Sequence, residues 1–119
     1  MDIRRLAIRA AVLAPLIAVA ATFFLNVCHL IYDCGCVSIW NGGAAFCNIQ
    51  TAGPPDCPFC ARPNVAYGSL YGTFLVQGVV MFAPASLGLG IRALLGLAAF
   101  PLVVGATGIV LGLWVGYWT

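Results

Sequence analysis

The chain has 119 residues, of which 63% are hydrophobic and 7% charged. Soluble domains carry about 25% charged residues, so this composition excludes an ordinary water-soluble fold and indicates an exterior that faces lipid. Five arginines and three aspartates give a net charge of +2, and the chain has no lysine or glutamate. This balance also excludes intrinsic disorder and a basic surface for nucleic acid. We therefore expect the lipid bilayer, and no nucleic acid, as a partner.

Three apolar stretches are long enough to cross a membrane, because about 20 helical residues span the roughly 30 Å of hydrocarbon. The first begins between residues 6 and 10 and ends at 27, and the other two cover residues 66–87 and 93–118. Residues 88–92 form a glycine-rich turn between the last two. The sequence thus predicts an all-α integral membrane protein with three transmembrane helices. It is organised as a first helix with its N-terminal flank, a cysteine-rich, mostly irregular loop, and a helical hairpin, at residues 1–27, 28–65 and 66–119.

The arginines indicate the orientation of the chain in the membrane. Arg4, Arg5 and Arg9 flank the first apolar stretch, and Arg92 lies between the second and third stretches. The loop between the first two stretches has only Arg62. Since basic residues accumulate on the cytoplasmic side, we expect a cytoplasmic N-terminus with an extracytoplasmic loop and C-terminus.

The predicted hydrocarbon region contains no charged residue and few polar ones. Transport of ions or protons needs such groups inside the membrane, so the sequence argues against a transporter. The polar exceptions are Gln77, Ser86 and Thr107, and Gln77 is expected to form one interhelical hydrogen bond. Pro84 and Pro101 are expected to bend the second and third helices.

Small residues recur at four-residue spacing in the predicted helices, which places them on one face of each helix. Without side chains, two backbones approach closely and gain dispersion contacts that lipid does not match. Because all three helices have such faces, we expect other integral membrane subunits to dock on some of them. The predicted helix-packing residues are Gly68, Gly72, Gly108, Gly112, Gly116 and Gln77.

All six cysteines lie in the loop, which is too short to bury a core that offsets its ordering entropy. Such a loop needs disulfides, a metal or a partner to fold. An even number of cysteines on the extracytoplasmic side favours three structural disulfides, and the spacing leaves their pairing open. The cysteines are Cys28, Cys34, Cys36, Cys47, Cys57 and Cys60.

A metal centre is the alternative to disulfides. Cys34 and Cys36 form one close pair, and Cys57 and Cys60 form another. Paired thiolates on separate turns hold tetrahedral zinc or an iron–sulfur centre, and Cys28 and His29 are expected to add ligands. In the disulfide interpretation no cofactor is expected.

Thiol redox chemistry is a third interpretation of the same residues. The segment Cys57-Pro58-Phe59-Cys60 resembles the active-site tetrapeptide of glutaredoxins, with proline second and an aromatic residue third. This resemblance covers four residues and implies a catalytic dithiol. In the thioredoxin fold the first such thiol lies at a helix N-terminus within a βαβ context, for which this loop has no room. We therefore do not expect an enzyme.

These observations favour a small, non-catalytic accessory subunit of a larger membrane complex, such as a respiratory, photosynthetic or other oxidoreductase assembly. Its disulfide-stapled loop would cap or dock a partner. The alternative is a metal-binding or thiol-redox membrane protein that uses the two cysteine pairs. A third hypothesis is a self-assembling membrane or virion component that uses the same small-residue faces.

Overall fold

The computed structural model describes residues 2–48, 56–84 and 86–118. The long helices α1, α3 and α4 cover Ile3–Tyr32, Pro63–Phe82 and Leu89–Val115. The short helical turns η1, η2 and α2 cover Ile39–Asn41, Gly43–Phe46 and Pro58–Ala61. Each long helix is long and apolar enough to cross a membrane, and the described residues contain no β-strand. This confirms the predicted all-α membrane fold with three spanning helices and a cysteine-rich connection.

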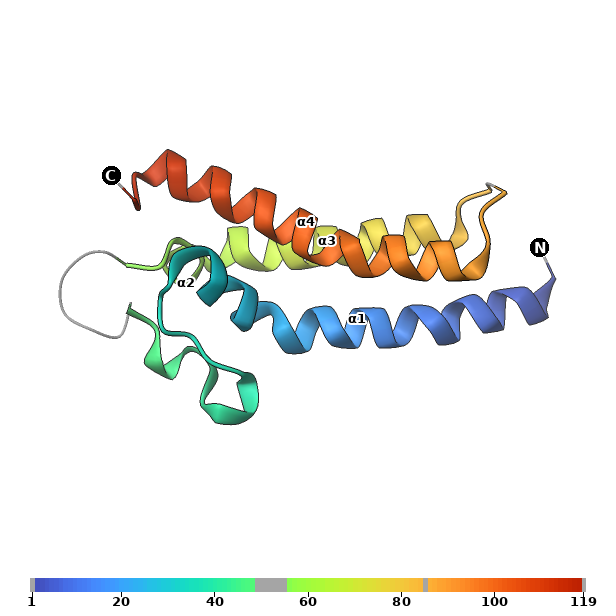
Figure 1. Ribbon diagram of the computed structural model, residues 1–119, viewed down its shortest axis with the longest axis horizontal. Helices are drawn as coiled ribbons and strands as arrows, with labels where there is room; N and C mark the ends of the chain where they lie inside the picture. Colours follow the sequence, from blue (N-terminus) through green and yellow to red (C-terminus); the bar gives the residue numbers. More distant parts are fainter. Residues whose placement is uncertain (1, 49–55, 85, 119) are drawn as a thin grey trace.

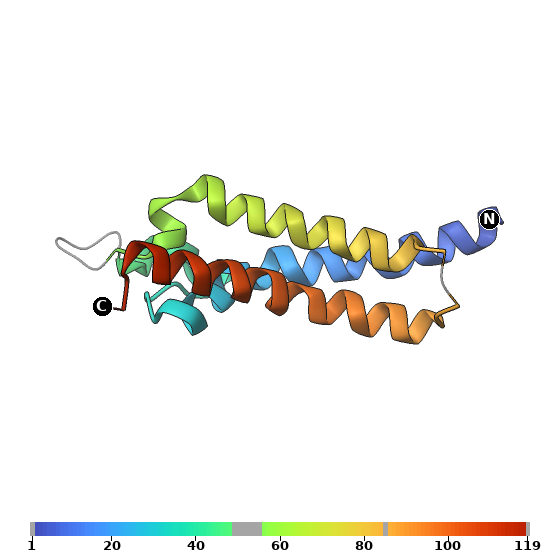
Figure 2. The same cartoon turned by 90° about the horizontal axis from the view of Figure 1, so that it is seen from above.

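The three long helices lie side by side in an elongated bundle that measures 55 × 29 × 20 Å (Figure 1). Helices α3 and α4 run antiparallel to one another, and α1 packs against both of them (Figure 2). The N-terminus and the α3–α4 turn lie at one end of the bundle (Figure 1). The C-terminus, α2 and the η turns lie at the other end, which we call the cysteine end.

The outer surface of α3 and α4 is apolar. Large side chains project outward along both helices, and their exposed fractions are 66% to 70% at Leu75, Leu94, Leu102, Val110 and Leu113. An apolar surface of this extent is not stable in water and marks contact with a non-aqueous partner. The length of the helices identifies that partner as lipid.

Helix α1 is longer than the sequence predicts, because it continues beyond residue 27 to Tyr32. Its 30 residues span about 45 Å, more than the roughly 30 Å of hydrocarbon, so part of the helix extends beyond the membrane. Cys28 and His29, which were expected in the loop, are therefore held on the last turns of a helix. Asp33 ends α1 with a φ of 50°, and its N–H donates to the His29 carbonyl at 2.7 Å.

Helix α3 is shorter than predicted and ends at Phe82. Ala83 is extended, which is the conformation favoured immediately before a proline. Pro84 therefore lies in the connection and does not bend the helix, contrary to the prediction. The turn between α3 and α4 covers residues 83–88 instead of residues 88–92.

Arg92 lies in the first turn of α4 and is only 1% exposed. Its Nε donates to the Leu87 carbonyl at 3.1 Å, and its Nη1 donates to the carbonyls of Val80 and Met81 at 2.8 and 3.2 Å. The last carbonyls of a helix have no intrahelical partner, so the guanidinium caps the C-terminus of α3 and offsets the negative end of its dipole. Arg92 is thus a buried cap and not only a marker of one membrane surface.

A polar stripe on α3 faces the interior of the bundle. Ser69, Thr73 and Gln77 are buried at four-residue spacing. The hydroxyls donate within α3, from Ser69 to the Ala66 carbonyl at 2.7 Å and from Thr73 to the Ser69 carbonyl at 3.0 Å. Gln77 Nε2 donates to the Gly96 carbonyl of α4 at 3.0 Å, which is an interhelical bond of the expected kind. Because this stripe is buried, the exposed side of α3 that faces lipid is apolar.

Two of the predicted packing glycines, both on α4, allow close contacts inside the chain. A Cβ atom added at Gly108 would lie 2.9 Å from Cδ1 of Ile31 in α1. One added at Gly112 would lie 2.4 Å from a ring atom of Trp118. Side chains from the same chain therefore cover both glycines.

The remaining predicted packing glycines differ from these two. Gly68 would have no atom within 4 Å of an added Cβ, and Gly72 would meet Val103 only at 3.9 Å. Gly116 follows the end of α4 and adopts a φ of 72°, a left-handed conformation that ends the helix. The four-residue spacing in α4 therefore includes two packing positions and one helix cap.

Candidate metal centre

All six cysteines meet at the cysteine end, although they come from separate segments of the chain. One is on α1, two follow α1, one follows η2 and two belong to the α2 region; they are Cys28, Cys34, Cys36, Cys47, Cys57 and Cys60. Five of them are at most 3% exposed, and Cys60 is partly buried. We call this set of six sulfurs the thiol cage.

The sulfurs of the thiol cage lie close together without covalent bonds. The Sγ–Sγ distance is 3.1 Å between Cys47 and Cys60, 3.2 Å between Cys28 and Cys57, and 3.5 Å between Cys28 and Cys34. A disulfide requires about 2.05 Å. All six cysteines are free thiols in the structure, so the disulfides expected from the sequence stay a prediction.

The thiol cage has the geometry of an octahedron. Four groups of three sulfurs lie within 4.8 Å of one another, namely Cys28–Cys57–Cys60, Cys28–Cys34–Cys36, Cys34–Cys47–Cys57 and Cys36–Cys47–Cys60. Every cysteine belongs to two groups, and any two groups share one cysteine. The pairs that occur in no group are Cys28–Cys47, Cys34–Cys60 and Cys36–Cys57. Six points that each have four close neighbours and one opposite point are the corners of an octahedron. All eight of its faces join three sulfurs within 4.8 Å of one another, and the four groups named above are alternate faces.

His29 and Gly35 shape the chain between α1 and the next cysteines. Gly35 has a φ of 91°, which residues with a side chain rarely adopt, and this turn directs Cys34 and Cys36 to the same cage. The Gly35 N–H donates to His29 Nδ1 at 3.0 Å, and His29 Nε2 lies 3.5 Å from Asp33 Oδ1. Both ring nitrogens therefore have protein partners. His29, a predicted metal ligand, belongs to none of the sulfur groups found among the described residues.

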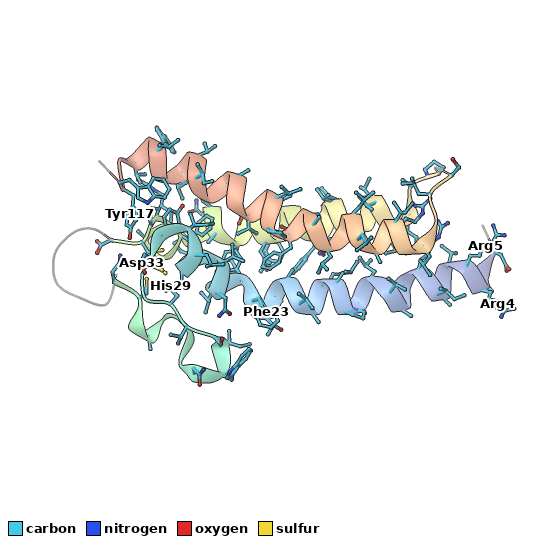
Figure 3. The ribbon with its side chains drawn as sticks, in the orientation of Figure 1. Arg4, Arg5, Phe23, His29, Asp33 and Tyr117 are labelled. Atoms are coloured by element: carbon cyan, nitrogen blue, oxygen red, sulfur yellow. The ribbon has the colours of Figure 1, made fainter. Side chains whose placement is uncertain are left out.

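Asn48 connects three segments around the thiol cage. Its Oδ1 accepts the Cys57 N–H at 2.6 Å, and its backbone N–H donates to the Cys34 carbonyl at 2.6 Å. Its Nδ2 donates to the Tyr117 hydroxyl at 3.0 Å, which in turn donates to the Tyr32 carbonyl at 2.7 Å. This chain of hydrogen bonds ties the cage to the end of α1 and to the C-terminal segment. Figure 3 labels Tyr117 beside His29 and Asp33 at this end of the molecule.

Aromatic rings pack beside the cage and exclude water from it. Phe59 is 2% exposed and stacks on Phe24 of α1, with 5.6 Å between ring centroids. Tyr32 packs edge-on against Phe59 at 5.5 Å and against Tyr117 at 5.1 Å. Its hydroxyl donates to the Gly108 carbonyl of α4. The thiols therefore lie against an apolar wall that α1, α2 and the C-terminal segment build.

The short helix α2 brings Cys57 and Cys60 to the cage together. Pro58 begins the helix, a position where the missing N–H of proline is not needed. The Ala61 N–H donates to the Cys57 carbonyl at 2.9 Å. Residues three apart share a face of a helical turn, so both sulfurs point the same way. The described residues around this tetrapeptide form no βαβ unit of the kind that supports glutaredoxin chemistry.

Hydrogen bonds among the thiols change their acidity. Hydrogen bonding to Cys28 is the main influence that lowers the pKa of both Cys34 and Cys60. Metals bind the thiolate and not the thiol. These two sulfurs therefore favour the thiolate form.

The sulfur cluster is larger than the predicted metal-binding set. The four sulfurs of the two predicted pairs belong to it, at Cys34, Cys36, Cys57 and Cys60. Cys28 and Cys47 also belong to it, and His29 does not. Cys47 has no neighbouring cysteine in the sequence, so spacing alone did not place it in the cluster.

An apolar cavity of about 310 Å³ lies beside the cage, between α1, α2 and α3. Cys28 and Cys60 contribute to its wall together with Phe24, Phe59 and Leu70. The cavity therefore borders the thiol cage on the side of α1, α2 and α3.

By fold the chain is an integral membrane protein with three spanning helices. No protein-family model, curated protein or solved structure matches it. Its distinguishing chemical feature is the thiol cage at one end of the bundle.

Proposed function

We propose that this protein binds soft metal ions through the thiol cage at the membrane surface. The observation that supports the proposal is the convergence of six free sulfurs, nearly all buried, in four groups within 4.8 Å. Thiols are weak hydrogen-bond donors and acceptors, so six of them gain little from contact with one another. Thiolates bind copper(I) and zinc strongly, so metal binding would explain why the six sulfurs lie together.

The spacing of the sulfurs fits metal ions bound directly by thiolates. Metal–sulfur bonds of about 2.3 Å place the sulfurs on one ion about 4 Å apart. The Cys36–Cys60 distance of 3.9 Å is of this size. In an iron–sulfur cluster, inorganic sulfide lies between the irons and holds the cysteine sulfurs farther apart. The cage has no space for such a core, so we do not propose an iron–sulfur centre.

The proposal includes an extracytoplasmic location for the cage. Arg4 and Arg5 lie at the end of the bundle opposite the cysteine end (Figure 3). Basic residues favour the cytoplasmic side of a membrane. An extracytoplasmic cage would meet metal ions before they cross the membrane.

Metal content and thiol state of the purified full-length chain test this proposal. The protein is kept reduced in mild detergent without oxygen, exposed to copper(I) or zinc, and washed. We expect the metal to remain bound and all six cysteines to resist alkylation until a chelator removes it. The matched control is a variant with all six cysteines replaced by serine, which should retain no metal.

Structural disulfides are the competing state of the same residues. A chain isolated without reductant that contains no metal, lacks six hydrogens by intact mass and reacts with alkylating agents only after reduction would support them. Failure of the reduced chain to bind either metal would then overturn the metal proposal.

The accessory-subunit hypothesis loses part of its basis. The hypothesis assumed that a single chain leaves some small-residue helix faces uncovered. Gly108 and Gly112, however, are covered by side chains of this chain. Gly68 has open space around it and stays available to another subunit. Purification in mild detergent tests this hypothesis, since a stoichiometric second protein would support it and a stable monomer would oppose it.

A further inference from the structure

We infer that the thiol cage binds four copper(I) ions as one cluster, in which each ion caps one group of three sulfurs and each sulfur bridges two ions. The inference rests on the proposed function and specifies the metal and the number of ions. Its basis is the octahedral arrangement of the six sulfurs.

An octahedron of sulfurs offers no preformed tetrahedral site. Tetrahedral zinc needs four sulfurs that all lie about 3.8 Å from one another. Any four corners of the octahedron include an opposite pair, and those pairs occur in none of the close groups. Two zinc ions that share thiolates need two such sets of four. Zinc therefore requires the cage to rearrange.

The centre of the octahedron is also unsuitable for a single ion. An ion at the centre would face all six thiolates, whereas zinc takes four ligands in a tetrahedron and copper(I) takes three in a plane. The faces are therefore the positions that a metal can occupy.

Each face suits an ion with three ligands in a plane. Bonds of about 2.3 Å to three sulfurs place these sulfurs about 4 Å apart. The measured separations between neighbouring sulfurs are 3.1, 3.2, 3.5 and 3.9 Å, and all those within the groups are at most 4.8 Å, a range that brackets the value for three thiolates on one ion. Copper(I) is a soft, closed-shell ion that accepts three thiolates. It matches the faces in both ligand type and ligand number.

The pattern of shared cysteines determines how many ions the cage accepts. Every sulfur belongs to two of the four groups, so four ions use each sulfur twice and leave none unbound. Faces that share an edge would bring two ions into collision, so only alternate faces fill together. Four ions therefore complete the cluster, and removal of one sulfur destroys two sites at once.

The complete cluster has a small net charge for its number of ions. Binding releases six thiol protons to solvent, and copper stays in the +1 state, so no oxidant or reductant takes part. Six thiolates with four copper(I) ions have two net negative charges. Buried charge is costly, and Cys28, Cys47 and Cys57 are 0% exposed.

Anaerobic titration of the reduced full-length chain with copper(I), supplied as its bicinchoninate complex, tests the inference. We expect native mass spectra to show four copper ions and the loss of six protons, with few molecules at intermediate loading. Luminescence should rise and saturate at the same ratio, because the aromatic wall shields the cluster from water. X-ray absorption should show copper–sulfur bonds of about 2.3 Å together with copper–copper scattering.

Single substitutions test the sharing of sulfurs between ions. Cys47→Ser and Cys60→Ser each remove one corner, and saturation should fall from four ions to two. Ser86→Ala, which lies in the α3–α4 turn far from the cage, should still bind four. Circular dichroism verifies that each variant remains helical, and the partly exposed Cys60 provides the variant least disruptive to packing.

The outcomes separate this inference from the proposed function. Saturation at one or two copper ions, or tight zinc binding without a four-copper species, would overturn the cluster and leave metal binding in place. A reduced chain that holds neither metal would overturn both. Saturation at four in the wild type and at two in both cysteine variants would establish the shared cluster.

Discussion

Asn48 shows how a residue that is not a ligand controls the position of several ligands. Its side chain accepts from the backbone of Cys57 and donates to Tyr117, while its own backbone holds Cys34. Outer groups of this kind hold ligands in the orientation that a metal requires, and their loss reduces affinity. Asn48 therefore has the role of a positioning residue for the thiol cage.

Asn48→Ala should weaken copper(I) binding by about 10- to 100-fold, because the Cys57 N–H and the Tyr117 hydroxyl lose their partner. Competition with a coloured copper(I) chelator measures the change. Asn64→Ala is the matched control, since Asn64 is exposed in the first turn of α3, and it should bind copper like the wild type. Unchanged affinity in the Asn48 variant would show that the cage does not depend on this residue.

Sequence spacing identifies only part of the site at the level of residues. The two cysteine pairs are visible because their members are close along the chain. Cys47 reaches the two pairs because its neighbour Asn48 donates a backbone hydrogen bond to the Cys34 carbonyl. These two residues are 14 positions apart, and no local pattern encodes that hydrogen bond. His29 has the chemistry of a ligand, but the turn at Gly35 occupies its Nδ1 with a backbone N–H.

At the scale of elements, α4 carries glycines in two different environments. Gly112 faces the rings of Trp118 and Tyr32, so even a methyl group there would collide with rigid atoms. Gly105, on the same helix, would have no atom within 4 Å of an added Cβ. The two positions separate the effect of close packing from the effect of helix propensity.

Gly112→Ala should destabilise the protein by about 1–3 kcal/mol, because a ring or the helix must move to admit the methyl group. Gly105→Ala should be neutral or stabilising by up to about 1 kcal/mol, since alanine favours helix more than glycine. Thermal unfolding in detergent measures both. Equal destabilisation by the two substitutions would contradict the assigned packing role of Gly112.

The helices themselves could be predicted, whereas their ends could not. Hydropathy identifies the part of a helix that contacts lipid, and all three apolar stretches became spanning helices. The ends depend on single residues, such as the left-handed Asp33 after α1 and the extended Ala83 before Pro84. Asp33 lies beyond the first apolar stretch and Ala83 lies inside the second, so hydropathy located neither end, although the number of helices was correct.

The whole molecule is asymmetric along its long axis, with exposed arginines at one end and the thiol cage at the other (Figure 3). This asymmetry predicts a cytoplasmic N-terminus and an extracytoplasmic C-terminus. Alkaline phosphatase, which is active only outside the cytoplasm, should be active when fused to the C-terminus and inactive when fused to the N-terminus. The reverse pattern would place the thiol cage in the cytoplasm and contradict the proposed location.

The buried cap formed by Arg92 has a consequence for how the protein is made. Arg92 follows the carbonyls of Val80 and Met81 in the chain, so α3 leaves the ribosome before its C-terminal partner exists. Open carbonyls are costly in lipid. We therefore expect helix α3 to reach its stable inserted state only after the first turn of α4 has been synthesised, so that the two helices enter the bilayer as one hairpin.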